Sequence, residues 1–207
     1  MSKLRIALSK GSLLEPTIAS LTKAGFDIAP LRRESRQLRL VAEGGIEYLI
    51  ARAADVPTYV ERGAVDIGFV GSDILMENKY EVVELKDLAF GCCKFILAGQ
   101  KKSTGLASDP DSILTIATKY PNIAAEYLAR IGRQAEIIKL YGSLELAPLA
   151  GLADQIIDLM STGRTLAENG LEVVDEIADV SCHLIANYVS YKLKSSRIDE
   201  LAQKVGS

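Results

Sequence analysis

The chain has 207 residues, of which 48% are hydrophobic and 25% are charged, and its formal net charge is −3. This length and apolar content suit one large domain or two small ones with a buried core. The acidic balance argues against a nucleic-acid partner, because such binding depends on neutralising phosphates with an excess of lysine and arginine.

The predicted elements alternate between strands and helices along the whole chain. We expect strands at residues 4–8, 38–42, 46–51, 64–70, 82–88, 93–98, 113–117, 135–140, 156–159, 171–180 and 183–188. We expect helices from a Ser12–Glu15 capping box to Gly25, from 55 to 63, from 121 to 132, from 166, and from a cap at Ser196. Alternation of this kind predicts an α/β fold with mainly parallel sheets.

Residues 99–111 are polar and rich in glycine and serine, which is typical of a surface loop. The break in composition between residues 89 and 110 indicates a second structural unit. The N-terminus lacks the apolar core of a secretory signal, and no stretch reaches transmembrane length. We therefore expect a cytoplasmic protein with no membrane partner.

Three cysteines, Cys92, Cys93 and Cys182, lack metal-ligand spacing, and adjacent cysteines rarely share one zinc ion or pair with each other. We expect reduced thiols in a reducing compartment. His183 is the only histidine and lies in an apolar stretch without an identifiable partner, so we interpret it as structural.

Polar residues follow three of the predicted strands. They are Ser9-Lys10-Gly11, Arg52 and Gly71-Ser72-Asp73. Open α/β sheets bind ligands at the carboxyl ends of their strands, where Lys10 would meet a phosphate. Taken alone, Lys10 is more simply a solvated loop lysine, and the recurrence at three strand ends is the informative feature.

The segment Ser161-Thr162-Gly163-Arg164-Thr165 connects a predicted strand to a predicted helix. A hydroxyl-rich glycine loop that opens a helix presents free N–H groups, which together with the helix dipole bind an anion such as phosphate. Gly163 allows close approach of the backbone, and Thr162 and Thr165 add hydroxyl donors.

Two carboxylates, Asp154 and Asp158, precede this loop, and Asp158 lies near the end of the predicted strand. They would accept hydrogen bonds from sugar hydroxyls or from water around a magnesium ion. Our hypothesis is that the segment grips a ribose 5-phosphate. An ordinary strand–turn–helix with a threonine N-cap remains the alternative, and for the pattern alone it is the commoner outcome.

Seven motifs, taken together and in order, resemble those of ATP phosphoribosyltransferase, the first enzyme of histidine biosynthesis. They are Leu8-Ser-Lys-Gly11, Arg52-Ala-Ala-Asp-Val-Pro57, Val65-Asp-Ile-Gly-Phe-Val-Gly-Ser-Asp73, Ile116-Ala-Thr-Lys-Tyr-Pro121, Gly142-Ser-Leu-Glu-Leu-Ala-Pro148, Gly151-Leu-Ala-Asp154 and Asp158-Leu-Met-Ser-Thr-Gly-Arg-Thr-Leu166. The motifs cover most of the chain, and its length matches the short form of the family, which lacks a C-terminal regulatory domain.

The resemblance implies two α/β domains of the periplasmic-binding-protein type II kind with an interdomain cleft. The first domain would comprise residues 1–90 plus 176–207. The second would comprise residues 91–175 and carry the phosphoribosyl pyrophosphate loop.

The resemblance also implies a reaction in which ATP and phosphoribosyl pyrophosphate give N1-(5-phosphoribosyl)-ATP and pyrophosphate. The residues that would bind phosphoribosyl pyrophosphate are Asp154, Asp158, Ser161, Thr162, Gly163, Arg164 and Thr165. Those that would bind ATP and phosphates are Lys10, Gly11, Arg36, Arg52, Gly71, Asp73 and Ser143. Asp158 and Glu145 would be catalytic, and Mg²⁺ would arrive with the substrate, with Asp154 as the one candidate protein contact.

Glu145 has two open interpretations: it contacts the substrate and receives a proton from the adenine amine, or it is a carboxylate near a helix dipole. The chain departs from the family at Ser12, where arginine is usual, and at Ala53, where proline is usual. Arg36 is a candidate replacement for the missing arginine, although a solvated arginine explains it equally well.

The resemblance implies a homodimer of catalytic chains and a regulatory subunit similar to histidyl-tRNA synthetase, joined in a hetero-octamer. A non-enzymatic protein of the same fold that binds a small solute or effector is the alternative function.

Overall fold

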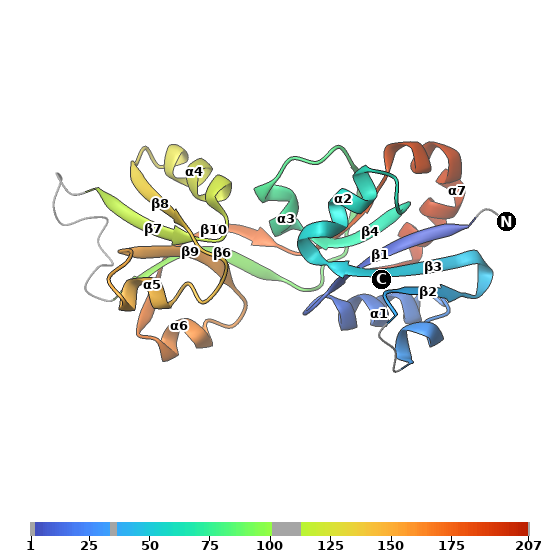
Figure 1. Ribbon diagram of the computed structural model, residues 1–207, viewed down its shortest axis with the longest axis horizontal. Coiled ribbons are helices and arrows are strands. Elements are labelled where there is room, and N and C mark those ends of the chain that lie inside the picture. The colour runs from blue at the N-terminus through green and yellow to red at the C-terminus, as the bar shows by residue number, and fades with distance from the viewer. Residues whose placement is uncertain (1–2, 34–36, 101–112, 207) are drawn as a thin grey trace. The chain divides into compact units, whose positions relative to one another are not determined.

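The computed structural model describes residues 3–33, 37–100 and 113–206, and the chain forms two compact units. Unit 1 comprises Met1–Cys92 and Ser181–Ser207, and unit 2 comprises Cys93–Val180 (Figure 1). The chain therefore leaves unit 1 once and returns once. The expected second boundary, after residue 175, falls inside strand β10, which remains whole in unit 2.

Unit 1 contains a six-stranded sheet in the order β2-β3-β1-β4-β11-β5. The strands are β1 (Leu4–Lys10), β2 (Arg39–Ala42), β3 (Ile46–Arg52), β4 (Ile67–Gly71), β5 (Val83–Asp87) and β11 (Cys182–Ala186). Strands β3 and β4 both run parallel to β1, so the carboxyl ends of these three strands meet at one edge. Lys10, the last residue of β1, pairs with Arg52, the last residue of β3.

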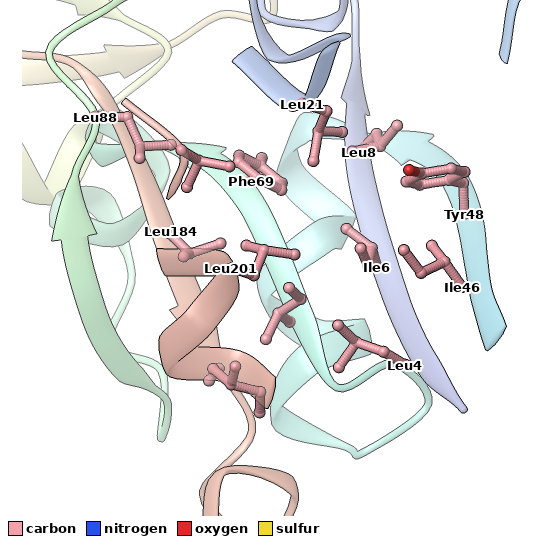
Figure 2. Packing of buried hydrophobic residues seen from close by; sticks show 14 of the residues in the cluster. Leu4, Ile6, Leu8, Leu21, Ile46, Tyr48, Phe69, Leu88, Leu184 and Leu201 are labelled. Atoms are coloured by element: carbon pink, nitrogen blue, oxygen red, sulfur yellow. The ribbon is translucent and has the colours of Figure 1, made fainter. Parts of the chain in front are cut away.

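Helices cover both faces of this sheet. They are α1 (Leu14–Lys23), α2 (Val56–Glu61), α3 (Ser72–Glu77) and α7 (Tyr188–Lys204), with short 3₁₀ turns η1 (Ala29–Arg32), η2 (Glu43–Gly45) and η3 (Ala53–Asp55). Figure 2 shows the core on one face, where Ile6 and Leu8 of β1 and Phe69 of β4 pack with Leu21 of α1 and Leu201 of α7. Removal of this apolar surface from water drives the packing.

Unit 2 contains a five-stranded sheet in the order β10-β6-β9-β7-β8. The strands are β6 (Cys93–Gln100), β7 (Leu114–Thr118), β8 (Ala135–Lys139), β9 (Gln155–Met160) and β10 (Leu171–Val180). Helix α4 (Pro121–Arg130) packs on one face, through Ile123, Ala124, Tyr127 and Leu128. Two short helices, α5 (Leu146–Leu149) and α6 (Arg164–Glu168), pack on the other face, as Figure 1 shows.

Both sheets are mixed, so the expectation of mainly parallel sheets was wrong. Among the described residues, four strand pairs are parallel and five are antiparallel. Each sheet keeps three parallel strands, β3-β1-β4 and β9-β7-β8, and adds antiparallel strands beside them. The alternation of strands and helices in the sequence does not predict the direction of these added strands, because that direction depends on pairing with distant segments.

Two predicted helix starts were also wrong. Helix α7 begins at Tyr188, where the Asn187 side chain accepts a hydrogen bond from the Ser190 N–H, and not at Ser196, although the helix is kinked at Lys194. The Ser12–Glu15 capping box does not form, because α1 begins at Leu14 without a side-chain cap and Glu15 pairs with Arg32.

Asp66 forms a buried ionic network within unit 1 between β1, β4 and α7. Its carboxylate accepts hydrogen bonds from the Arg5 N–H (2.8 Å), the Ser190 hydroxyl (2.7 Å) and the Lys194 ammonium (2.8 Å). Burial raises the pKa of Asp66, but the hydrogen bonds from Lys194, Arg5 and Ser190 outweigh it, so the pKa lies below its usual value. None of the helices in the described ranges combines the length and the apolar character needed to cross a membrane.

We expect Asp66→Ala to lower the free energy of unfolding by about 3 kcal/mol, because it removes a buried carboxylate that pairs with the half-buried Lys194 and bonds to Arg5 and Ser190. The stabilisation by Asp66 is present above about pH 4 and is lost as the pH falls through its lowered folded-state pKa. Urea unfolding followed by circular dichroism at pH 7 and at pH 3 measures both effects. Glu200→Ala, which removes an exposed i,i+4 pair with Lys204, is the control and should change little.

Candidate functional site

The first pocket lies in unit 1, at the carboxyl ends of β1 and β3. It is a cavity of about 400 Å³ that brings Lys10 and Arg52 together. Its other lining residues are Ala7, Leu38, Arg39, Leu49, Ile50, Ala51, Asp55 and Tyr59. The Lys10 and Arg52 side chains are exposed, and Arg39 is ion-paired with the buried Glu47. Among the described residues, Lys10 and Arg52 form no ion pair, so the pocket combines this positive charge with one carboxylate, Asp55, and an apolar and aromatic wall.

The other predicted residues of unit 1 lie at the same sheet edge but do not line this cavity. Gly11 follows β1 with φ 107°, a conformation that favours glycine. Gly71 ends β4, and a Cβ placed there would lie 2.2 Å from an oxygen of Asp73. Arg36 lies outside the described residues.

The second pocket lies in unit 2 and is formed by the phosphate-loop candidate, Ser161–Thr165. It is a cavity of about 240 Å³, and Asp158 and Glu145 line it together with the loop. The remaining lining residues are Ile96, Leu159, Met160 and Leu166. The structure therefore brings together the loop and both residues that were predicted to be catalytic.

The loop geometry leaves backbone donors available. Gly163 is the N-cap of α6 in the left-handed conformation, with φ 73°, and its carbonyl accepts the first helical hydrogen bond, from Ala167. In the described part of the chain, no backbone carbonyl accepts from the N–H of Thr162, Gly163 or Thr165. Such N–H groups around a small cavity form an anion site. The helix begins at Arg164, two residues earlier than expected.

The Arg164 side chain forms an ion pair with Glu168, one turn further along α6. Its Nε donates to Glu168 at 2.7 Å, and the side chain is mostly exposed. The N–H of Arg164 lies 3.5 Å from the Thr162 hydroxyl, at the limit of a hydrogen bond. The Arg164 guanidinium is therefore engaged by Glu168, and the residue contributes to the loop through its backbone N–H.

Asp158 is the most perturbed carboxyl group of this pocket. Its pKa is raised to about 6, chiefly because burial disfavours the charged form; the Leu159 N–H lowers this pKa, the nearby Glu145 charge raises it, and the Lys119 charge lowers it. The Leu159 N–H donates to Asp158 Oδ1 at 2.8 Å. A buried carboxyl group with a pKa shifted toward neutrality inside a cavity is typical of a functional site.

Glu145 occupies the N-cap position of α5 but makes no side-chain capping hydrogen bond. Its carboxylate lines the cavity, which favours the interpretation as a substrate contact over that as a helix-dipole carboxylate. Ser143, two residues earlier, has φ 49°, which is unusual for a residue other than glycine, and it does not line the cavity.

Asp154 was predicted to act beside Asp158, but it lies at the opposite end of β9. It precedes the six-residue strand, roughly 20 Å from the loop that follows it. Its Oδ2 accepts from the Thr115 N–H at 2.8 Å, which fixes the turn into the strand. Since Asp154 and Ser161 flank the two ends of one strand, Asp154 cannot contact the same sugar or its magnesium ion.

In the described ranges, no three histidine, cysteine or acidic side chains lie close enough together to bind a metal ion. His183, expected to have no partner, places Nδ1 3.2 Å from Glu84 Oε2 on the neighbouring strand β5. That contact depends on pairing between β11 and β5, which sequence periodicity does not reveal.

Sequence reasoning missed Lys119 in unit 2 and Arg39, Asp55 and Tyr59 in unit 1 as site residues. Lys119 directly follows β7, the strand beside β9, and its charge acts on Asp158. Its position after a strand is the same signal that singled out Lys10 and Arg52. No comparable signal marks Tyr59, which reaches the pocket from the middle of α2.

We expect Asp158→Asn to stabilise the protein at alkaline pH. Because the folded-state pKa of Asp158 is raised to about 6, its contribution to stability falls as the pH rises from about 4 to 6. The substitution should therefore raise the free energy of unfolding by about 2–3 kcal/mol at pH 8 and little at pH 4, measured by urea unfolding. Asp154→Asn, directly before the same strand, is the control, and an equal gain there would contradict this account.

Comparisons with known proteins agree along the whole chain. A family model described as ATP phosphoribosyltransferase matches residues 52–207. An ATP phosphoribosyltransferase of Alkaliphilus metalliredigens is 44% identical over 211 residues, covering 100% of both chains. One of Geobacter metallireducens is 47% identical, covering 97% of this chain and 95% of its own.

Solved structures extend the agreement to the fold, which is two α/β domains of the periplasmic-binding-protein type II kind. The ATP phosphoribosyl transferase (HisG:HisZ) complex from Thermotoga maritima contains a chain that is 37% identical, with a TM-score of 0.80. The match covers 97% of this chain and 98% of that one. The chain belongs to the ATP phosphoribosyltransferase family.

Proposed function

We propose that the chain condenses ATP with phosphoribosyl pyrophosphate to give N1-(5-phosphoribosyl)-ATP and pyrophosphate, the first step of histidine biosynthesis. One observation carries the assignment of the site: the Ser161–Thr165 loop presents unpaired N–H groups to a cavity that Asp158 and Glu145 also line. A role in binding without catalysis is not favoured, because full-length relatives are named ATP phosphoribosyltransferases.

The sugar substrate would bind in unit 2. Backbone N–H groups and the hydroxyls of Ser161, Thr162 and Thr165 hold its 5-phosphate, and Gly163 allows the backbone to approach closely. Asp158 then lies beside the ribose ring. The cavity of about 240 Å³ has room for the phosphate and part of the sugar.

The nucleotide would bind in unit 1. Lys10 and Arg52 face the triphosphate, and Tyr59 and Leu38 offer an apolar wall to the adenine. Stacking on aromatic rings is favourable for every base, so this wall contributes affinity with little selectivity. Gly11, Gly71, Asp73 and Ser143 remain candidates for further contacts with ATP.

Catalysis would rest on electrostatics and positioning. N1 of the adenine attacks C1 of the ribose with inversion, while the bond from C1 to pyrophosphate breaks and the ring gains positive charge. Asp158, ionised above about pH 6, stabilises that charge, and Glu145 receives the proton from the adenine amine. Lys10 and Arg52 offset phosphate charge.

Enzymes of this family use a metal ion, and we propose Mg²⁺. Mg²⁺ keeps part of its water shell and is commonly bound through substrate phosphates, which are abundant in both substrates. When bound, the ion would supply positive charge to the departing pyrophosphate. Asp154 precedes β9 and bonds to the Thr115 N–H, which supports a metal held through the substrate and not through this carboxylate.

We further propose that the chain acts in the cytoplasm within an assembly. Cys92, Cys93 and Cys182 form no disulfide with one another, which suits a reducing compartment. The chain from Thermotoga maritima belongs to a complex titled HisG:HisZ. By that likeness, a regulatory subunit similar to histidyl-tRNA synthetase would join dimers of this chain in a hetero-octamer.

The direct test mixes the chain with ATP, phosphoribosyl pyrophosphate and Mg²⁺, with and without a regulatory subunit from the same source, and follows the absorbance of the product. We expect turnover that depends on both substrates. Binding of both substrates to the complete assembly without product formation would contradict the enzymatic assignment and favour the solute-binding alternative.

Gly163→Ala tests the phosphate loop. The new Cβ lies 3.3 Å from Met160 Sδ and occupies a backbone with φ 73°, so the loop must shift. We expect KM for phosphoribosyl pyrophosphate to rise about tenfold or more, since losing roughly 1.4 kcal/mol of binding has that effect. Steady-state kinetics with saturating ATP measures it.

Gly170→Ala is the matched control for that variant. Gly170 follows the same helix with φ 67°, so alanine is strained there to a similar degree, but a Cβ would meet no atom within 4 Å. Its KM should stay near the wild-type value. An equal rise in KM for both variants would assign the effect to general strain and remove the loop from the site.

A further inference from the structure

Lys119 lies on the same face of the sheet as Asp158. Strands β7 and β9 are parallel, and Ala117 pairs with Ile156 and Thr118 with Ile157. Ala117 and Ile156 both belong to the apolar cluster under α5 and α6. Alternate residues of a strand share a face, so the next positions on that face are Lys119 and Asp158, at the carboxyl ends of adjacent strands.

The charges around Asp158 come from three elements. Glu145 precedes α5 and lines the same cavity, and Arg164 begins α6 with its guanidinium paired to Glu168. Lys119 follows β7, is exposed, and forms no ion pair with any residue in the described ranges. Its ammonium lies 5.3 Å from the centroid of the Tyr120 ring, a weak contact at an exposed site.

A bound phosphate would create an electrostatic conflict in this cavity. The Ser161–Thr165 loop and Asp158 share about 240 Å³, so a phosphate in the loop places negative charge close to a half-buried carboxylate. A like charge favours the protonated form of a carboxyl group. A protonated Asp158 could not stabilise positive charge on the ribose. Without a nearby positive charge to keep Asp158 ionised, phosphate binding would therefore slow the reaction.

We propose that Lys119 is a positioning residue that keeps Asp158 ionised while phosphate occupies the Ser161–Thr165 loop. This inference rests on the proposed function for the role of Asp158, but the charge coupling itself does not. Lys119 supplies a positive charge beside the Asp158 carboxylate. Arg164 does not supply it, because its guanidinium is paired with Glu168. The Lys119 charge already lowers the pKa of Asp158 in the free protein, which supports this role.

The first experiment measures the Asp158 carboxyl group directly. Proteins with ¹³C-labelled aspartate are titrated between pH 4 and 9, with and without saturating inorganic phosphate, and Asp158→Asn assigns the signal. We expect Lys119→Met to raise the pKa of Asp158, by about one unit with phosphate bound and by less without it. Lys119→Arg should behave as the wild type.

Lys139→Met is the matched control. Lys139 ends β8, the neighbouring strand on the other side of β7, and pairs with Thr118. It follows Ala135 and Ile137 on the face that packs against α4, away from Asp158. The variant removes one exposed lysine from the same sheet edge, and the pKa of Asp158 should not move.

The second experiment measures kcat in the complete assembly, with both substrates saturating, between pH 5.5 and 8.5. The pH dependence of kcat reports groups of the substrate-bound enzyme, which is the state in which phosphate occupies the loop. We expect Lys119→Met to shift the acid limb to higher pH, with a loss of roughly three- to tenfold at pH 6 and near wild-type values at pH 8.5. Lys119→Arg should restore the wild-type profile.

The two measurements separate the possible failures. An unchanged pKa of Asp158 in Lys119→Met overturns the inference whatever the kinetics show. A raised KM for phosphoribosyl pyrophosphate with kcat unchanged at every pH also overturns it, because it identifies Lys119 as a direct phosphate contact. A raised pKa without turnover in any protein, wild type included, supports the coupling and refutes the proposed reaction.

Discussion

The common direction of three neighbouring parallel strands in each sheet is the constraint on which both pockets depend. Along a strand the ladder occupies the backbone N–H and C=O groups, so free groups and polar side chains collect where strands end. Lys10 and Arg52 end paired strands of unit 1, and Lys119 and Ser161 follow paired strands of unit 2. The same rule removes Asp154 from the site, because it precedes its strand.

The partial burial of Asp158 lowers the stability of unit 2 at neutral pH and strengthens the interaction of its carboxylate with positive charge. The apolar cluster under α5 and α6 continues along the sheet to the carboxyl group, and its low polarity raises the pKa of Asp158 to about 6. Folding would be more favourable with a neutral residue there. A carboxylate held in a poorly solvated cavity, however, interacts more strongly with a developing positive charge than one in water does.

Local signals in the sequence predicted most of the elements and the phosphate loop, since apolar runs, glycine turns and hydroxyl clusters act over a few residues. They failed where distant segments decide the outcome. Ser196 looks like a helix cap, yet Asn187 caps α7, because its side chain also bonds to the carbonyls of Val60 and Glu61. The antiparallel strands of both sheets and the contact between His183 and Glu84 likewise depend on pairing across the chain.

The two pockets differ in charge although both are proposed to take phosphorylated substrates. The pocket of unit 1 is lined by three cations and one carboxylate, Asp55, whereas the cavity of unit 2 contains two carboxylates, Asp158 and Glu145, beside its anion loop. Backbone N–H groups resolve this contradiction, because they bind phosphate through dipoles and add no net charge. Side chains of the opposite sign then remain available for a ribose that becomes positive as its leaving group departs. A loop built from lysines would bind phosphate more tightly but would oppose that positive charge, so a glycine turn flanked by hydroxyls suits the chemistry better.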